Sequence, residues 1–234
     1  MRTNGLIPPA LPGASPKGWG LAAVGALVGI SMTGLLTGVV AGSDWRAPLL
    51  MAPLAASSVL LFGFPASPMA RPWAIIVGHV VSALVGVVVA HLIPNLIFAS
   101  GLAVALAILA MAATRSMHPP GGSTALIAVL GGPGVKTAAY SYALLPVGVN
   151  TVLLVGIGWL FHRWVSGHSY PHASLSTAPA PASASEIGIW TEDIEAVIAR
   201  YGDILDIDRS EVEILVREAE RAARLRRGSP TFPA

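Results

Sequence analysis

The chain has 234 residues, of which 54% are hydrophobic and only 11% are charged. This composition lies far outside that of soluble domains and indicates a membrane protein, so neither a soluble enzyme nor a nucleic-acid partner is expected. Because the chain contains no cysteine, disulfides, thiolate metal sites and thiol redox chemistry are excluded as well.

The predicted elements begin with a leader, residues 1–19, which is rich in Pro and Gly and has no apolar stretch. It is expected to be disordered and cytoplasmic rather than a signal peptide. Four segments, 21–40, 73–92, 96–113 and 143–164, are each long enough to cross about 30 Å of hydrocarbon. Two shorter apolar segments, 49–64 and 121–130, predict broken or re-entrant helices. We therefore expect residues 20–165 to form an all-α polytopic membrane helical bundle.

The charges are divided unevenly along the chain. Residues 1–185 contain seven Lys or Arg against one acid, Asp44, whereas residues 186–234 contain seven Arg and eleven acids. Basic residues near membrane boundaries are ordinary topology signals. The shortage of acids carries more information, because cation and proton carriers usually retain an intramembrane carboxylate. The membrane region therefore favours an anionic or neutral permeant.

The two short segments resemble each other at a constant offset of 67 residues. In both, a proline (Pro53 and Pro120) precedes small residues, then hydroxyls, then aliphatic residues. This similarity predicts two three-helix repeats, 21–92 and 96–164, and an odd number of crossings would invert the second repeat. Chance similarity between two segments of small residues is the alternative.

The basic residues test the topology. With six crossings and a cytoplasmic N-terminus, most of them fall inside and only Arg46 and Lys136 fall outside, as the positive-inside rule expects. If both short segments were re-entrant instead, Arg71 and Arg115 would also lie outside. We expect six crossings, and both arrangements place the C-terminal tail in the cytoplasm.

The stretch MHPPGGSTAL, residues 117–126, has the features of an anion site at a helix start. Two prolines can open the helix, the two glycines leave its first N–H groups uncovered, and such helix starts attract anions. His118 could gate or bind the anion, and Arg115 would add positive field. The first short segment would supply a second helix start. The candidate binding residues are Pro53, Ala55, Ala56, Ser57, Ser58, His79, Arg115, His118, Pro119, Pro120, Gly121, Gly122, Ser123, Thr124 and Asn150.

Structural and functional alternatives remain open for these residues. The Pro and Gly cluster could be a loop, and the hydroxyls could bond carbonyls one turn back. His79 and Asn150 could serve function or join helices by hydrogen bonds. A neutral-solute channel would be insensitive to neutralisation of Arg115. A membrane-embedded enzyme would need a metal held by His79, His91 and His118, which lack ligand spacing and carboxylates, so no metal or cofactor is expected.

The chain also resembles the HPP family of integral membrane proteins, named for the motif His118-Pro119-Pro120. The resemblance covers about residues 20–165 and includes MAPLAASSVLLFGFPASPMARPWAIIVGHVVSALVGV (51–87) and MHPPGGSTALIAVLGG (117–132). It implies a transporter, with nitrite as the expected anion because plastid and cyanobacterial relatives are associated with nitrite transport. Members commonly have Phe-Gly where this chain has Leu54-Ala55, a departure that could reshape the first half of the site.

Beyond the membrane region, residues 166–185 predict a Pro, Ala and Ser-rich linker, and residues 186–234 predict a small cytoplasmic helical hairpin. So few residues bury too little surface to be stable alone, so the hairpin is expected to dock on the membrane part or on another subunit. A loosely structured tail is the alternative. The expected partners are a small anion, membrane lipid and a second copy in a homodimer, and the expected location is a bacterial inner membrane.

Overall fold

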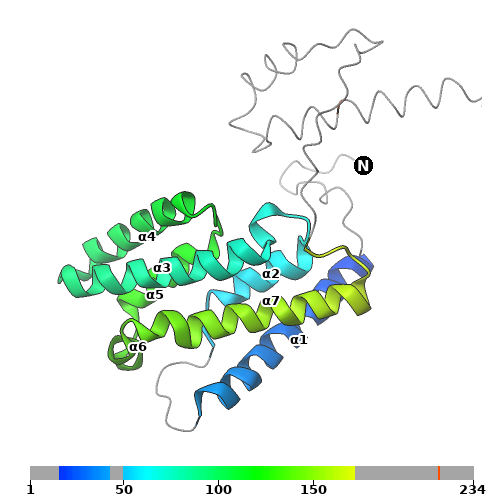
Figure 1. Cartoon of the computed structure of the whole chain (residues 1–234), viewed down its shortest axis with the longest axis horizontal. Coiled ribbons are helices and arrows are strands. Elements are labelled where there is room, and N and C mark those ends of the chain that lie inside the picture. Colours follow the sequence, from blue (N-terminus) through cyan, green and yellow to red (C-terminus); the bar gives the residue numbers. More distant parts are fainter. Residues whose placement is uncertain (1–15, 43–49, 172–215, 217–234) are drawn as a thin grey trace, which may run out of the picture. The chain divides into compact units, whose positions relative to one another are not determined.

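The computed structural model describes residues 16–42, 50–171 and the single residue 216. Within these ranges the chain is helical and has no strand (Figure 1). A 3-10 turn, η1 (Pro68–Ala70), precedes α3, and two π-helical segments, η2 (Ala143–Gly148) and η3 (His162–Ser166), extend α7 at its two ends. The α-helices are α1 (Pro16–Ala41), α2 (Leu54–Gly63), α3 (Pro72–Leu92), α4 (Leu96–Ala113), α5 (Pro120–Leu130), α6 (Pro133–Ala138) and α7 (Val149–Phe161).

Four described stretches are long and apolar enough to cross a membrane, and they confirm the four predicted spans: Pro16–Ala41, Pro72–Leu92, Leu96–Ala113 and Ala143–Ser166. The helices α2 and α5 confirm the two predicted short segments. The described chain is therefore an all-α membrane helical bundle. Helix α1 begins at Pro16, inside the predicted leader, because proline fits the first turn of a helix, where its missing N–H is not needed. The rest of the leader and the predicted tail, apart from residue 216, lie outside the described residues.

Helix α3 is the most enclosed of the long helices. It contacts α4, α5 and α7, whereas α1 contacts α2 and α7. Half of the most apolar window of α3 is buried (50%), against 22% in α1 and in α4. Large apolar side chains such as Leu27 on α1 and Ile97 on α4 remain exposed. These outer faces suit contact with lipid, and α3 is placed to carry buried polar groups.

The direction of the helices alternates along the chain. In Figure 1, α1 and α3 run the same way and α2 returns between them, while α4, α5 and α7 follow the same pattern in the opposite sense. This order agrees with six passes in which each short helix reverses the direction of the chain. The side of the membrane on which each end lies stays a prediction.

Small residues allow α3 to approach α5 closely. A Cβ added at Gly86 would collide with the Ala125 carbonyl oxygen, and one added at Gly78 would lie 2.7 Å from the Ser116 carbonyl oxygen and 2.9 Å from His118 Cβ. Such spacing of small residues lets helix backbones touch in lipid. The close contact brings the polar residues of α3 against the start of α5.

The chain remains packed beyond Ser166, where the predicted linker begins. Gly167 adopts a left-handed conformation (φ 70°) that turns the backbone after η3. Tyr170 is buried and its hydroxyl donates a hydrogen bond to the Ala70 carbonyl oxygen at 2.9 Å. Burial raises the pKa of the Tyr170 phenol above its ordinary value and so favours the protonated form that donates this hydrogen bond. Residues 167–171 therefore belong with the membrane bundle, which composition alone did not reveal.

Candidate functional site

Four buried polar side chains from separate parts of the chain meet inside the bundle. Ser57 comes from the first turns of α2, His79 from α3, His118 from the junction of α4 and α5, and Thr124 from α5. Each has 0% of its surface exposed. We call these four residues the histidine–hydroxyl cluster. The sequence predicted each of them as a site residue, and the structure brings all four together.

Hydrogen bonds join the histidine–hydroxyl cluster into one continuous chain. The Ser57 Oγ atom lies between the two rings, 2.7 Å from His79 Nε2 and 2.8 Å from His118 Nε2. On the far side of its ring, His79 Nδ1 is 2.6 Å from Thr124 Oγ1. On the far side of the other ring, His118 Nδ1 is 2.8 Å from the Met69 carbonyl oxygen. The two imidazole rings meet edge to face, with centroids 4.8 Å apart.

The Met69 carbonyl fixes the direction of every hydrogen bond in this chain. A carbonyl oxygen only accepts, so His118 Nδ1 must carry a proton, and in the neutral ring Nε2 must then accept from the Ser57 hydroxyl. Ser57 has no second hydrogen, so it accepts from His79 Nε2–H. His79 Nδ1 in turn accepts from the Thr124 hydroxyl. The neutral cluster therefore has a single orientation, from Thr124 to Met69.

Each hydroxyl also has a second acceptor one turn back on its own helix. Ser57 Oγ is 3.3 Å from the Pro53 carbonyl oxygen, and Thr124 Oγ1 is 3.4 Å from the Pro120 carbonyl oxygen. If His118 takes up a proton, Ser57 can turn its hydrogen to Pro53 and accept from both rings. When His79 is protonated, Thr124 can turn its hydrogen to the Pro120 carbonyl and accept from His79 Nδ1–H. The cluster thus provides complete hydrogen bonding with neutral rings and with one ring charged.

No carboxylate is available to balance such a charge in the part of the chain that the structure describes. Residues 16–42 and 50–171 contain no Asp or Glu, because Asp44 and every acid from Glu186 onward lie outside these ranges. A buried charge without a counter-ion is costly. An imidazolium in this cluster would therefore be stabilised by an anion brought from outside the bundle.

One buried hydroxyl beside the cluster has no partner. Ser82 lies one turn after His79 on α3, is fully buried, and its Oγ atom makes no hydrogen bond among the described residues. A Cβ added at Gly121 would lie 2.8 Å from this oxygen, so the glycine leaves the hydroxyl open towards the start of α5. Ser82 is not among the candidate binding residues predicted from the sequence. Its missing partner was a property of the fold, with no signal in the sequence.

The sequence predicted open N–H groups at the starts of the two short helices, but in the structure these groups are hydrogen-bonded. At α5, the Gly121 and Gly122 N–H groups donate to the His118 and Pro119 carbonyl oxygens at 2.8 and 3.0 Å. At α2, the first N–H groups likewise donate to the turn before the helix. The chain enters both helices through a tight turn, which uses these donors. The helix starts still contribute partial positive charge, but side chains provide the open polar groups.

The remaining predicted residues are divided between the interior and the surface. Arg115 is exposed and has a left-handed backbone (φ 52°), and its side chain makes no hydrogen bond or ion pair among the described residues. Ser58 is buried but donates to the carbonyl oxygen of Ala55 on its own helix. Pro53, Pro120 and Gly121 are buried, Gly122 is partly buried, and Ala55, Ala56, Pro119 and Ser123 are exposed.

Asn150 lies apart from the cluster and joins helices. Its Oδ1 atom accepts from the Met51 backbone N–H at 3.0 Å, and its Nδ2 atom donates to Thr37 Oγ1 at 2.8 Å. These bonds tie α7 to α1 and to the turn before α2. This is the interhelical role that the sequence left open.

The three histidines considered for a metal site do not converge. His79 and His118 are adjacent, but His91 lies twelve residues further along α3, about 18 Å away at the rise of an α-helix. Among the residues that the structure describes, no three His, Asp or Glu side chains are grouped to hold a metal ion.

Comparison with known proteins also identifies this part of the chain as a transmembrane region. The family model described as the HPP transmembrane region matches residues 11–171, more than half of the chain. The chain belongs to the HPP family. Two transmembrane proteins of Dictyostelium discoideum are similar to this HPP chain, one 35% identical over 132 residues and the other 36% identical over 126 residues. These alignments cover 55% and 52% of this chain, but only 46% and 40% of the relatives' own length. No solved structure matches the HPP chain.

The HPP motif now has a structural explanation in this chain. His118 extends its ring into the cluster, while Pro119 and Pro120 have helical geometry and open α5 immediately after it. The motif thus fixes an imidazole at the start of a short buried helix. The Met69 carbonyl, which orients that ring, lies in η1 and could not be selected from the sequence, because any residue type supplies a carbonyl.

Proposed function

We propose that this HPP protein transports a small inorganic anion together with a proton, and that the histidine–hydroxyl cluster takes up the proton. The observation that supports the proposal is the paired arrangement of His79 and His118, in which each hydroxyl has one acceptor for the neutral rings and another for a charged ring. Nitrite is the first substrate to test, because the family resemblance implies it.

The absence of carboxylates from residues 16–42 and 50–171 supports the coupling of proton and anion. A protonated ring is unfavourable in the empty site, and an anion alone would find few open donors there. Bound together, the two charges offset each other, with the Ser82 hydroxyl available as a direct contact. A monovalent anion and one proton would then cross the membrane without net charge.

An internal duplication would explain how the site opens alternately to the two sides. Ser57 and Thr124, which are 67 residues apart, bind the two nitrogens of His79, and each also contacts the carbonyl of the aligned proline. The packing is related as well, because α1 contacts α2 and α7 while α4 contacts α5 and α3. Rocking of inverted repeats around a central site is a common transport mechanism. We propose this arrangement here, in a bacterial inner membrane with both termini cytoplasmic.

The test is flux into proteoliposomes that contain the purified protein and a pH-sensitive dye. Nitrite, nitrate, formate, chloride and urea are compared under an imposed pH gradient and, separately, under an imposed membrane potential. We expect saturable nitrite uptake that acidifies the lumen, responds to the pH gradient and is insensitive to the potential. Protein-free liposomes measure the diffusion of nitrous acid itself.

Other outcomes would replace this proposal. Anion uptake that follows the potential without moving protons would leave an anion transporter but remove the proton from the mechanism. Uptake of urea with no anion flux, unchanged after Arg115→Gln, would indicate a neutral-solute channel.

A further inference from the structure

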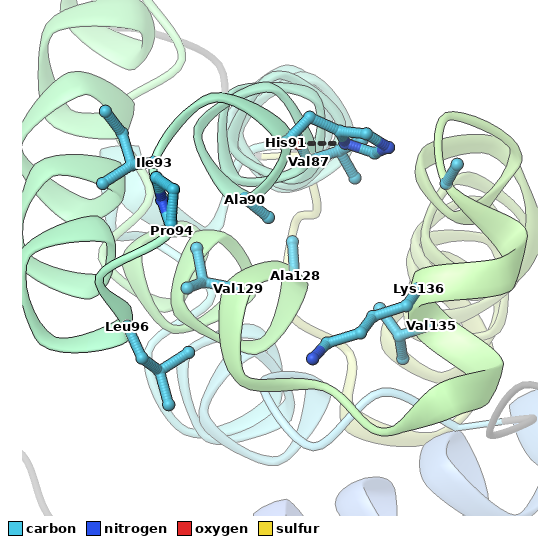
Figure 2. A pocket seen from close by; sticks show the side chains of 11 residues that line it. Val87, Ala90, His91, Ile93, Pro94, Leu96, Ala128, Val129, Val135 and Lys136 are labelled. Atoms are coloured by element: carbon cyan, nitrogen blue, oxygen red, sulfur yellow. Dashed lines mark hydrogen bonds between the residues drawn. The ribbon is translucent and has the colours of Figure 1, made fainter.

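A separate cavity of about 260 Å³ lies between the end of α3, the turn into α4, the end of α5 and α6 (Figure 2). Most of the side chains that line it are aliphatic, among them Val87, Ala90, Ile93 and Val129. Only two lining side chains can carry charge, His91 and Lys136, and neither belongs to the histidine–hydroxyl cluster. In Figure 2, Lys136 reaches from α6 towards the end of α5. His91 lies across the same gap, on α3.

The two polar side chains have unused binding capacity. His91 Nδ1 is 2.8 Å from the Val87 carbonyl oxygen, so this nitrogen carries the proton and leaves Nε2 as an acceptor in the neutral ring. The ring is held in place by stacking on Tyr140, with centroids 5.8 Å apart and an interplanar angle of 9°. Lys136 is exposed, and its side chain makes no hydrogen bond or ion pair with any described residue. The cavity therefore presents an acceptor and an unpaired cation on an aliphatic wall.

The cavity lies where lipid headgroups are expected. It is at the end of the membrane span Pro72–Leu92 and the beginning of the span Leu96–Ala113, which are joined by a three-residue turn. Asn95 in that turn accepts from the Phe98 N–H at 2.9 Å and starts α4. Leu96 lines the cavity and Ile97 follows it on the exposed surface of α4. The aliphatic wall is thus continuous with a surface that faces acyl chains.

The chemistry of this wall favours an amphiphile over a free inorganic anion. A small ion would lose part of its water in a cavity lined mainly by aliphatic side chains and gain only one charged contact, which is unfavourable. The cavity volume approaches the lower limit of small-molecule pockets, about 300 Å³. It is therefore larger than the space that a small ion occupies. A lipid can keep its phosphate beside the ammonium while its glycerol and first methylenes cover the aliphatic residues.

We propose that this cavity binds the headgroup of an anionic glycerophospholipid, with the phosphate on Lys136 and a headgroup hydroxyl donating to His91 Nε2. Phosphatidylglycerol has both groups, because its headgroup joins a phosphate to a free glycerol. A choline headgroup has no hydroxyl and adds a cation beside Lys136. The site is independent of the proposed transport reaction.

The test is native mass spectrometry of the detergent-purified protein with phosphatidylglycerol or phosphatidylcholine of identical acyl chains. We expect retention of phosphatidylglycerol, and Lys136→Gln is expected to weaken it about five-fold, the effect of removing one cation near an anionic lipid. Lys136→Arg should keep the binding. Lys17→Gln, which removes an exposed lysine from α1, is the matched control and should change nothing.

A second variant tests the aliphatic wall without altering the charge. Ala90→Phe fills the cavity and should weaken phosphatidylglycerol binding while Lys136 remains, with thermal melting as the check on folding. Equal binding of the two lipids, or unchanged binding in both Lys136→Gln and Ala90→Phe, would overturn the proposal. Displacement of the lipid by millimolar inorganic phosphate would instead identify a free-anion site. Because the readout is binding, none of these results depends on whether nitrite is transported.

Discussion

Thr124 supplies the hydrogen at one end of the histidine–hydroxyl cluster. Thr124→Val keeps the shape of the side chain but leaves His79 Nδ1 without the donor that lies 2.6 Å away. We expect nitrite-linked proton uptake in proteoliposomes to fall about tenfold, the effect of one buried hydrogen bond. Thr124→Ser restores the hydroxyl and should recover most of the flux. Ser100→Ala, which removes a hydroxyl bonded only within α4, is the control for a general loss of folding.

His118 is the residue whose protonation distinguishes transport with a proton from transport of the anion alone. His118→Gln can still donate to the Met69 carbonyl and accept from Ser57, but it cannot take up a proton. We expect slower nitrite flux that no longer acidifies the lumen and now responds to membrane potential. An unchanged ratio of protons to nitrite in this variant would assign the proton to another group. His118→Ala, which removes all these contacts, should nearly abolish flux, and wild-type flux after His118→Ala combined with Thr124→Val would contradict the site itself.

Ser82 allows anion binding to be separated from proton uptake. Its hydroxyl has no partner in the closed bundle, so Ser82→Ala removes a potential contact to the substrate without breaking a hydrogen bond of the protein. We expect a rise of a few-fold in the KM for nitrite, with the proton ratio unchanged, as one neutral hydrogen bond is worth about 1 kcal/mol. Kinetics over a range of nitrite concentrations measures this. An unchanged KM would remove Ser82 from the binding site.

The sequence revealed the polar residues of the site but not how they are connected. Ser57, His118 and Thr124 were predicted as parts of an anion site at the starts of the two short helices, and His79 as a polar residue within a long apolar helix. The meeting of the two rings at Ser57 depends on the packing of α2, α3 and the start of α5, and no spacing within one helix encodes such a contact. The same limit explains Arg115, which has the right charge and lies near His118 in sequence but is exposed.

At the scale of elements, the contact between α3 and α5 holds the cluster closed. Gly86→Ala would push a methyl group against the Ala125 carbonyl, and overpacking of this kind costs about 1–3 kcal/mol. We expect a lower midpoint of thermal unfolding. Gly101→Ala on α4 has no atom within 4 Å of its new Cβ and should keep or raise the midpoint, because alanine favours helix over glycine by up to about 1 kcal/mol. If both variants melt alike, the α3–α5 contact is looser than the structure indicates.

Element boundaries followed from hydrophobicity where the helices were long and regular. The span at 96–113 was predicted to the residue, and α5 differs by one residue at its start. Hydrophobicity gave no sign of η1 or of α6, since both are short and depend on local turns. It also missed the irregular start of the last span, where Leu145 leaves helical geometry beside Pro146.

At the scale of the whole molecule, the six-pass arrangement and a re-entrant arrangement place the same loops on different sides. With six passes, Ala66 lies in the cytoplasm and Thr137 outside, whereas two re-entrant segments would place both outside. Both residues are exposed in the structure, and the chain has no cysteine, so Ala66→Cys and Thr137→Cys each create a single reactive site.

The positive-inside distribution and the alternating helix directions both favour six passes. In intact cells we therefore expect a membrane-impermeant maleimide to label Thr137→Cys and to label Ala66→Cys only after lysis. Labelling of both in intact cells would mean that α2 and α5 enter and leave on one side, and the inverted-repeat mechanism would fail with it. His168→Cys, which lies on the cytoplasmic side in both arrangements, should remain unlabelled until lysis and so tests the integrity of the cells.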